Sequence, residues 1–112
     1  MSPNAAATKQ SAAPDLAQVD VATVLQALSD PVRLEIVSQI AGTGDGGELS
    51  CGQLEVPVGK STCSHHLKSL CCAGVIAERE EGTRKYLSLR RDELQERFPG
   101  LLDSVLKAAG RS

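Results

Sequence analysis

A run of short polar side chains between Ser61 and Leu70 carries the most chemistry in this sequence. If the run is helical, spacings of three and four place Cys63, Leu67, Leu70 and Gly74 on one side, as a core-facing stripe requires. The other side then presents hydroxyl, imidazole and ammonium groups, which can hydrogen-bond to base edges and phosphates. The alternative is a plain amphipathic surface helix. The candidate DNA-binding residues in this run are Ser61, Thr62, Ser64, His65, His66, Lys68 and Ser69.

Basic residues are concentrated in the segment around this run. Residues 60–90 contain six basic and three acidic side chains, a local charge of +3 in a chain whose formal net charge is −2. Long cations beside Gly82, at the tip of an expected hairpin, can reach phosphates or a narrow minor groove. Two glutamates, Glu80 and Glu81, oppose that attraction, so the hairpin is expected to contribute position more than affinity. On the local charge alone, the alternative to a DNA-binding patch is an ordinary solvated surface. Further candidate DNA contacts are Lys60, Arg79, Thr83, Arg84 and Lys85.

Helical patterns precede the polar run. Apolar residues recur at spacings of three and four from position 21 to 28, and residues 29–31 (Ser-Asp-Pro) predict the end of one helix and the start of a second, which reaches about Ala41. The glycine-rich segment 42–47 predicts a loop, and residues 48–50 a short edge strand. Ser50 is a candidate cap for a short helix to about Val56. After a turn at 57–59, the polar run is expected to be helical from Lys60 or Ser61 to Gly74.

Alternating apolar and polar residues over 75–79 and 86–89 predict a β-hairpin with a turn at 80–85. Helical stretches follow from Arg91 and from Leu101, interrupted near residues 98–100. The expected fold is therefore mainly α with a small β-hairpin, in the order α-α-(β)-α-α-β-β-α. Two helices joined by a tight turn and followed by a basic hairpin are the parts of a winged helix-turn-helix. We expect residues 1–15 to form a disordered tail and 16–110 a single DNA-binding and dimerisation domain.

Length and composition restrict the function further. A chain of 112 residues with one Phe, one Tyr and no Trp builds one modest core, which a second copy could help to cover. No apolar run approaches the ~20 residues of a membrane helix, and the N-terminus lacks the apolar stretch of a signal peptide. We therefore expect a cytoplasmic protein with reduced cysteines and no membrane partner. It contains no nucleophile motif, carboxylate pair or phosphate loop, so an enzyme is not expected.

Four segments together resemble the ArsR/SmtB family of winged-helix regulators: ALSDPVRLEIV (27–37), STCSHHLKSL (61–70), AGVI (73–76) and EGTRKY (81–86). The resemblance covers roughly residues 20–108. It implies a homodimeric regulator of transcription, usually a repressor, that binds a palindromic operator in double-stranded DNA. The helix 61–73 would enter the major groove, and the hairpin 79–86 would form the wing. Dimerisation through the first and last helices would involve Val21, Val24, Leu25, Leu28, Leu101, Leu102, Val105 and Leu106.

The metal-binding patterns of that family look absent here. The arsenical-type box has two cysteines one residue apart, whereas residues 48–54 contain Cys51 alone, and the last helix lacks the histidine of the zinc-type site. No cofactor is assigned, although a zinc or nickel ion stays open as an alternative. In that alternative, Cys71 and Cys72 or other Cys and His side chains bind a metal ion or are oxidised. Adjacent histidines on a helix point about 100° apart, which disfavours one ion between His65 and His66.

Overall fold

A computed structural model of the protein describes residues 14–44 and 46–109. Residues 1–13, where we expected most of a disordered tail, lie outside the described part. The first described residues already contact the domain. The Asp15 carboxylate accepts a hydrogen bond from the Ala17 backbone N–H (3.0 Å), and Arg90 Nη1 donates to the Pro14 carbonyl oxygen (2.8 Å). A short 3-10 turn, η2 (Leu16–Gln18), follows and buries Leu16.

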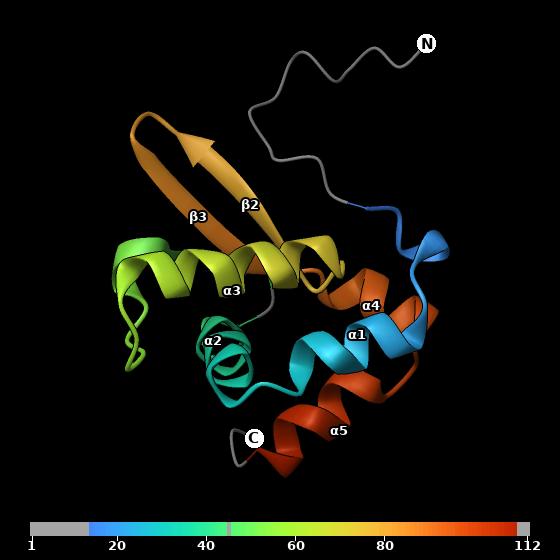
Figure 1. The fold of residues 1–112 in the computed structure, drawn as a ribbon. Helices are drawn as coiled ribbons and strands as arrows, with labels where there is room; N and C mark the ends of the chain where they lie inside the picture. The colour runs from blue at the N-terminus through green and yellow to red at the C-terminus, as the bar shows by residue number, and fades with distance from the viewer. Residues whose placement is uncertain (1–13, 45, 110–112) are drawn as a thin grey trace, which may run out of the picture.

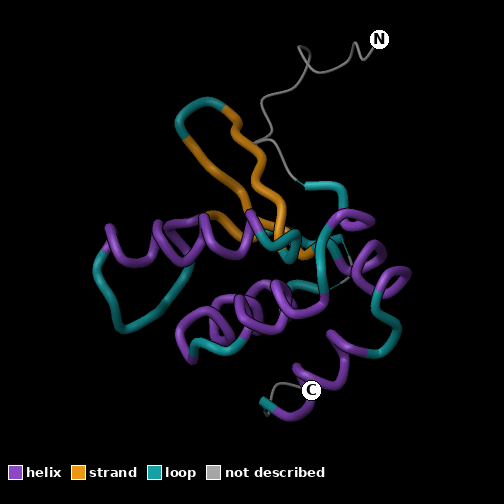
Figure 2. The backbone as a smooth tube through the Cα atoms, turned by 45° about the vertical axis from the view of Figure 1, so that its right-hand side comes forward, coloured by secondary structure: helices purple, strands orange, loops and turns teal. Residues whose placement is uncertain are grey.

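The described chain has the helical and β elements expected of a winged helix-turn-helix. Figures 1 and 2 show the β2–β3 hairpin projecting from a helical body, with α3 lying across its base. β3 is the central strand of a three-stranded antiparallel sheet in the order β1-β3-β2. This confirms the predicted α+β class. The elements are α1 (Val21–Leu28), α2 (Pro31–Ala41), β1 (Leu49–Ser50), η3 (Cys51–Gln53), α3 (Lys60–Cys72), β2 (Ile76–Glu81), β3 (Arg84–Leu89), α4 (Arg91–Arg97) and α5 (Leu101–Ala108).

The short helix expected from Ser50 to about Val56 is only the single turn η3. Gln53 Oε1 accepts hydrogen bonds from the backbone N–H (2.9 Å) and Oγ (3.1 Å) of Ser50, so the turn is closed at its start. Leu54 is already extended, with φ −71° and ψ 136°. Gly52 disfavours continuation because glycine loses more backbone freedom in a helix than other residues do. The segment before α3 is therefore a tight turn and an extended connection.

The hairpin is longer than expected, since its strands continue to Glu81 and restart at Arg84. Oppositely charged residues pair across its outer part, Glu80 with Lys85 and Glu81 with Arg84. Such pairs support a strand without apolar alternation, which is why the sequence pattern underestimated its length. A two-residue turn remains, with Gly82 at φ +63°, as a tight hairpin turn with glycine in its first central position requires.

The core lies between α3, α2 and the sheet, and it fixes which face of α3 is exposed. Its largest fully buried members are Val24, Ile36, Val37, Ile40, Leu70, Val75, Ile76 and Leu87, with Leu67 almost fully buried beside them. The corner between α1 and α2 is held by Asp30, whose carboxylate accepts from the backbone N–H of Val32 (2.8 Å) and Arg33 (3.1 Å). Those hydrogen bonds lower the pKa of Asp30. Arg33 Nε donates to the Ala27 carbonyl oxygen (2.8 Å) across the same corner.

Gly74 ends α3 as expected and lets the chain turn into β2. Its φ is +81°, and a Cβ atom built there would lie 2.5 Å from Leu16 Cδ2. A side chain at this position would meet both backbone strain and a buried leucine.

We predict that Gly74→Ala lowers the free energy of unfolding by about 2–5 kcal/mol, from left-handed strain and overpacking together. Gly82→Ala is the matched control, because it has a positive φ but open space around its Cβ. Strain alone should cost it about 1–2 kcal/mol. Urea unfolding of both variants measures the difference. Equal losses would contradict the close packing of Leu16 on Gly74.

Candidate nucleic-acid interface

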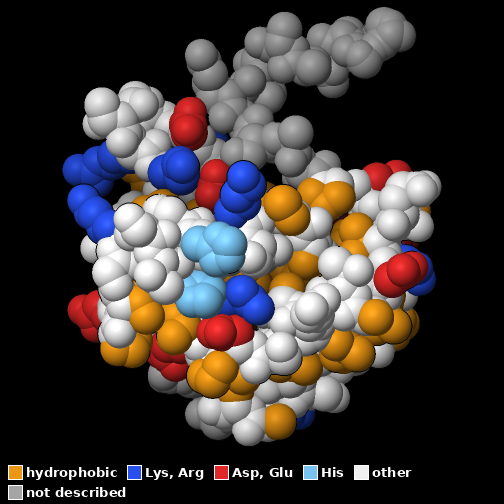
Figure 3. Space-filling view, viewed as in Figure 1, with side chains coloured by type: hydrophobic (Ala, Val, Ile, Leu, Met, Phe, Trp, Pro, Cys, Tyr) orange, Lys and Arg blue, Asp and Glu red, His pale blue; other side chains and the backbone are white. Residues whose placement is uncertain are grey.

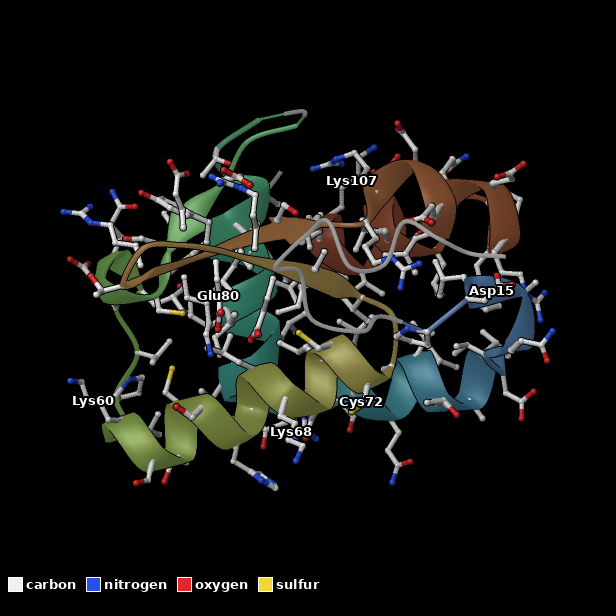
Figure 4. The ribbon with its side chains drawn as sticks, turned by 90° about the horizontal axis from the view of Figure 1, so that it is seen from above. Asp15, Lys60, Lys68, Cys72, Glu80 and Lys107 are labelled. Atoms are coloured by element: carbon white, nitrogen blue, oxygen red, sulfur yellow. The ribbon has the colours of Figure 1, made fainter. Side chains whose placement is uncertain are left out.

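The outer face of α3 is exposed and polar. Figure 3 shows both histidines beside Lys and Arg side chains on one face of the molecule, and Figure 4 shows Lys60 and Lys68 along the same helix. No acidic residue lies in the first turn of α3. A helix that starts with free backbone N–H groups and a lysine suits a phosphate. The exposed candidates on it are Lys60, Ser61, Thr62, Ser64, His65 and Lys68.

The hairpin places its basic residues close to the start of α3. Thr83, Arg84 and Lys85 are exposed, and the Lys85 Nζ atom is 3.8 Å from Glu78 Oε1. A cavity of about 330 Å³ between hairpin and helix is lined on one side by Lys85 and on the other by Lys60 and Ser64. A neighbouring hollow of about 510 Å³ is bordered by Ser64 together with Thr83, Arg84 and Lys85. The structure therefore brings the wing candidates and the start of the polar helix together around one groove.

Two of the predicted residues on α3 turn toward the helical body. His66 is half-buried, and its Nδ1 atom lies 3.4 Å from Nη1 of Arg33 on α2. Ser69 is half-buried and borders a hollow that also contains Arg33 and Thr23 of α1. These two side chains lie at the edge of the candidate interface. Sequence reasoning missed Arg33, because no local pattern shows that α2 and α3 cross there.

Arg79, another predicted contact, is bound by carboxylates of the same chain. Its Nη2 and Nε atoms lie 2.7 Å and 2.9 Å from the two carboxylate oxygens of Glu48, and its Nη1 lies 2.6 Å from Glu81 Oε1. The guanidinium also stacks over Tyr86, 4.6 Å from the ring centroid. These hydrogen bonds raise the pKa of Arg79 and lower the pKa of Glu48. Neither Glu48 nor Tyr86 stood out in the sequence, since both act through contacts distant along the chain.

The four cysteines have different environments. Cys72 is exposed as expected, whereas Cys71 is half-buried, so the two do not form the exposed vicinal pair that we expected. Burial, followed by the neighbouring Glu78, raises the pKa of Cys71 to about 12. Burial also raises the pKa of Cys51 and of Cys63, which line the same cavity beneath α3. Within residues 14–44 and 46–109, no group of three or more His, Cys, Asp or Glu side chains is arranged to hold a metal ion.

The eight predicted dimerisation residues divide into two sets. Val24, Leu28, Leu102 and Leu106 are buried in the core of the single chain. The side chains of Val21 and Leu25 remain 44% and 46% exposed, and Leu101 and Val105 are half-buried. Figure 3 shows hydrophobic side chains gathered over the surface that α1 forms. The second set alone is available to a partner.

The chain is similar to proteins that regulate transcription, although no protein-family model matches it. It is 40% identical to the helix-turn-helix transcriptional regulator YceK of Bacillus subtilis over 86 residues, which are 75% of this chain and 84% of YceK. It is 31% identical to the transcriptional repressor SdpR of the same organism, over 75% of this chain and 91% of SdpR. The arsenical resistance operon repressor of Staphylococcus xylosus is 35% identical over 77 residues, 67% of this chain and 70% of that protein. Among the described residues, no helix is long and apolar enough to cross a bilayer.

We predict that a thiol-alkylating reagent at pH 7 modifies Cys72 first and Cys71 at least about tenfold more slowly, because the thiolate is the reactive species. Because burial raises the pKa of Cys71 to about 12, its labelling rate should still increase about tenfold per pH unit up to pH 10. Peptide mass spectrometry after timed labelling measures both rates, and Cys72→Ser provides the control for assigning the fast phase. Equal rates at the two positions would contradict the burial of Cys71.

Proposed function

Because the chain belongs to the ArsR/SmtB family of winged helix-turn-helix transcriptional regulators, we propose that it represses transcription as a homodimer bound to a palindromic operator. Its relatives act as regulators of transcription and not as catalysts. In this proposal, the protein works in the cytoplasm on double-stranded DNA. Repression follows when the bound dimer occupies promoter DNA.

The observation that carries the proposal is the exposed polar face of α3 beside the basic wing. The inner face of that helix is fixed by Leu67 and Leu70, so Ser61, Ser64 and His65 point outward. Hydroxyl and imidazole groups can read base edges in the major groove. Lys60, Arg84 and Lys85 flank these groups and can bind the phosphates on either side, which fixes the register of the helix.

A dimer is well suited to bind a palindromic operator through this helix. Two reading helices about 34 Å apart can enter successive major grooves, and the two-fold axis of the pair matches a palindrome. The apolar side chains left exposed on α1, Val21 and Leu25, offer a surface for a second copy, and Val105 of α5 is half-buried. In this interface, α1 of one protomer would pack against α5 of the other.

We expect selection from a random pool of duplex DNA to recover an inverted repeat. Ser64→Ala and His65→Ala should each lower affinity for that repeat by about fivefold or more, as removal of a base-specific hydrogen bond does, while leaving the circular dichroism spectrum unchanged. Ser104→Ala, an exposed change on α5, serves as the matched control and should bind like the wild type. Wild-type affinity in both α3 variants would show that another surface reads the DNA.

For the dimer, we predict that Leu25→Glu and Val105→Glu give monomers by light scattering and lose operator binding. A large apolar side chain contributes about 1.5–3 kcal/mol when it is fully buried, and a carboxylate in its place must be desolvated. Ser104→Glu places the same charge on an exposed position of α5 and should remain dimeric. Leu102 is unsuitable for this test, because it is buried in the single chain and its substitution would cause unfolding as well as dissociation. Two dimeric variants with wild-type DNA affinity would place the interface elsewhere.

A further inference from the structure

The side chain of Arg79 reaches from β2 across β3 to the residue that precedes β1. Arg79 lies on β2, its guanidinium stacks over Tyr86 of the central strand β3, and it pairs through two hydrogen bonds with Glu48, the residue before β1. A third hydrogen bond joins it to Glu81 near the tip of the same strand. A planar fork over an aromatic ring, with a two-point carboxylate contact, fixes direction as well as distance.

The network of Arg79, Glu48, Tyr86 and Glu81 lies where it can control the orientation of the wing. β1 consists of two residues that pair with β3, Leu49 with Leu87 and Ser50 with Tyr86, and it leads directly into the turn η3 before α3. The outer half of the hairpin extends beyond that short pairing. A contact from β2 to Glu48 therefore joins the projecting hairpin to the segment that leads to the reading helix.

We propose that Arg79 is a positioning residue, which sets the orientation of the wing relative to α3 through Glu48, Tyr86 and Glu81 and makes no contact with DNA. The inference rests on the proposed function and deepens it. Two carboxylates already surround the guanidinium, and the three side chains together carry a formal charge of −1. Such a cluster attracts phosphates weakly, so its contribution to DNA binding is geometric.

The opposite assignment, a phosphate contact by Arg79, makes a different prediction about Glu48. Removing a carboxylate near bound DNA relieves repulsion and raises affinity when charge alone matters. If Glu48 instead anchors the wing, Glu48→Gln weakens binding although it makes the protein less acidic. The sign of this one change separates the two roles.

The experiment measures operator affinity against salt concentration for Glu48→Gln, Arg79→Gln and Arg79→Lys, using the inverted repeat recovered by selection. We expect at least about a threefold decrease in affinity in each, as coupled contacts give. Arg79→Lys should not restore wild-type operator affinity, because lysine keeps the charge but lacks the planar guanidinium. The salt slope should stay at the wild-type value in these variants. In Arg84→Gln, where one cation no longer neutralises a phosphate, the slope should decrease by about one unit per protomer.

Two controls keep the outcome clear. Glu80→Gln, an exposed neighbour outside the network, should bind DNA as tightly as the wild type or more tightly. The melting temperature should change by no more than a few degrees, since exposed ion pairs contribute little to stability. Unchanged or tighter binding by Glu48→Gln, with rescue by Arg79→Lys, would overturn the positioning role alone. Failure of the wild-type chain to bind any selected duplex would overturn the proposed function as well.

Discussion

The burial of the inner face of α3 is the constraint on which the rest of the molecule depends. Leu70 is fully buried and Leu67 nearly so, against a core that includes Ile36 of α2 and Leu87 of the central strand. A helix anchored along one stripe has no rotational freedom, so its outer face is determined by the sequence between the anchors. The hydroxyls and imidazoles of α3 are therefore presented by apolar packing, and a cavity in the core would also misdirect them.

Much of this arrangement could be predicted from the sequence because its signals are local. Periodicity located the helices, Asp30 and Pro31 marked the start of α2, and Gly74 marked the end of α3. The family resemblance, carried by four short segments, is confirmed by the relatives that the chain matches. The prediction of a short helix after Ser50 was wrong, because a capping residue shows where a helix can begin but not how far it continues.

Long-range contacts explain what the sequence could not show. A stripe of apolar residues on α1 and α5 indicates burial, yet periodicity cannot distinguish the core of one chain from the surface between two. Val24 and Leu102 are buried in the core of the single chain, whereas Leu25 is exposed and suited to a surface between two chains. Arg79 was counted as a free cation because Glu48 lies 31 residues away. Cys71 was expected beside Cys72 at the surface, but one helical step turns it toward the sheet.

Ion pairing within the chain also changes how its charge bears on DNA. Arg79 and Arg90 account for two of the six basic residues between positions 60 and 90, and both are paired with glutamates of the same chain. The exposed cations that flank the polar face of α3 are Lys60, Lys68, Arg84 and Lys85, and Lys85 also lies 3.8 Å from Glu78 Oε1. Non-specific affinity depends on the number of phosphates neutralised, so one protomer of an acidic protein has little of it. Two protomers on one duplex double the phosphate contacts, and hydrogen bonds to bases add to them only at the correct sequence. In the proposed dimer, the reading of bases in both half-sites would therefore supply most of the difference in affinity between an operator and other DNA.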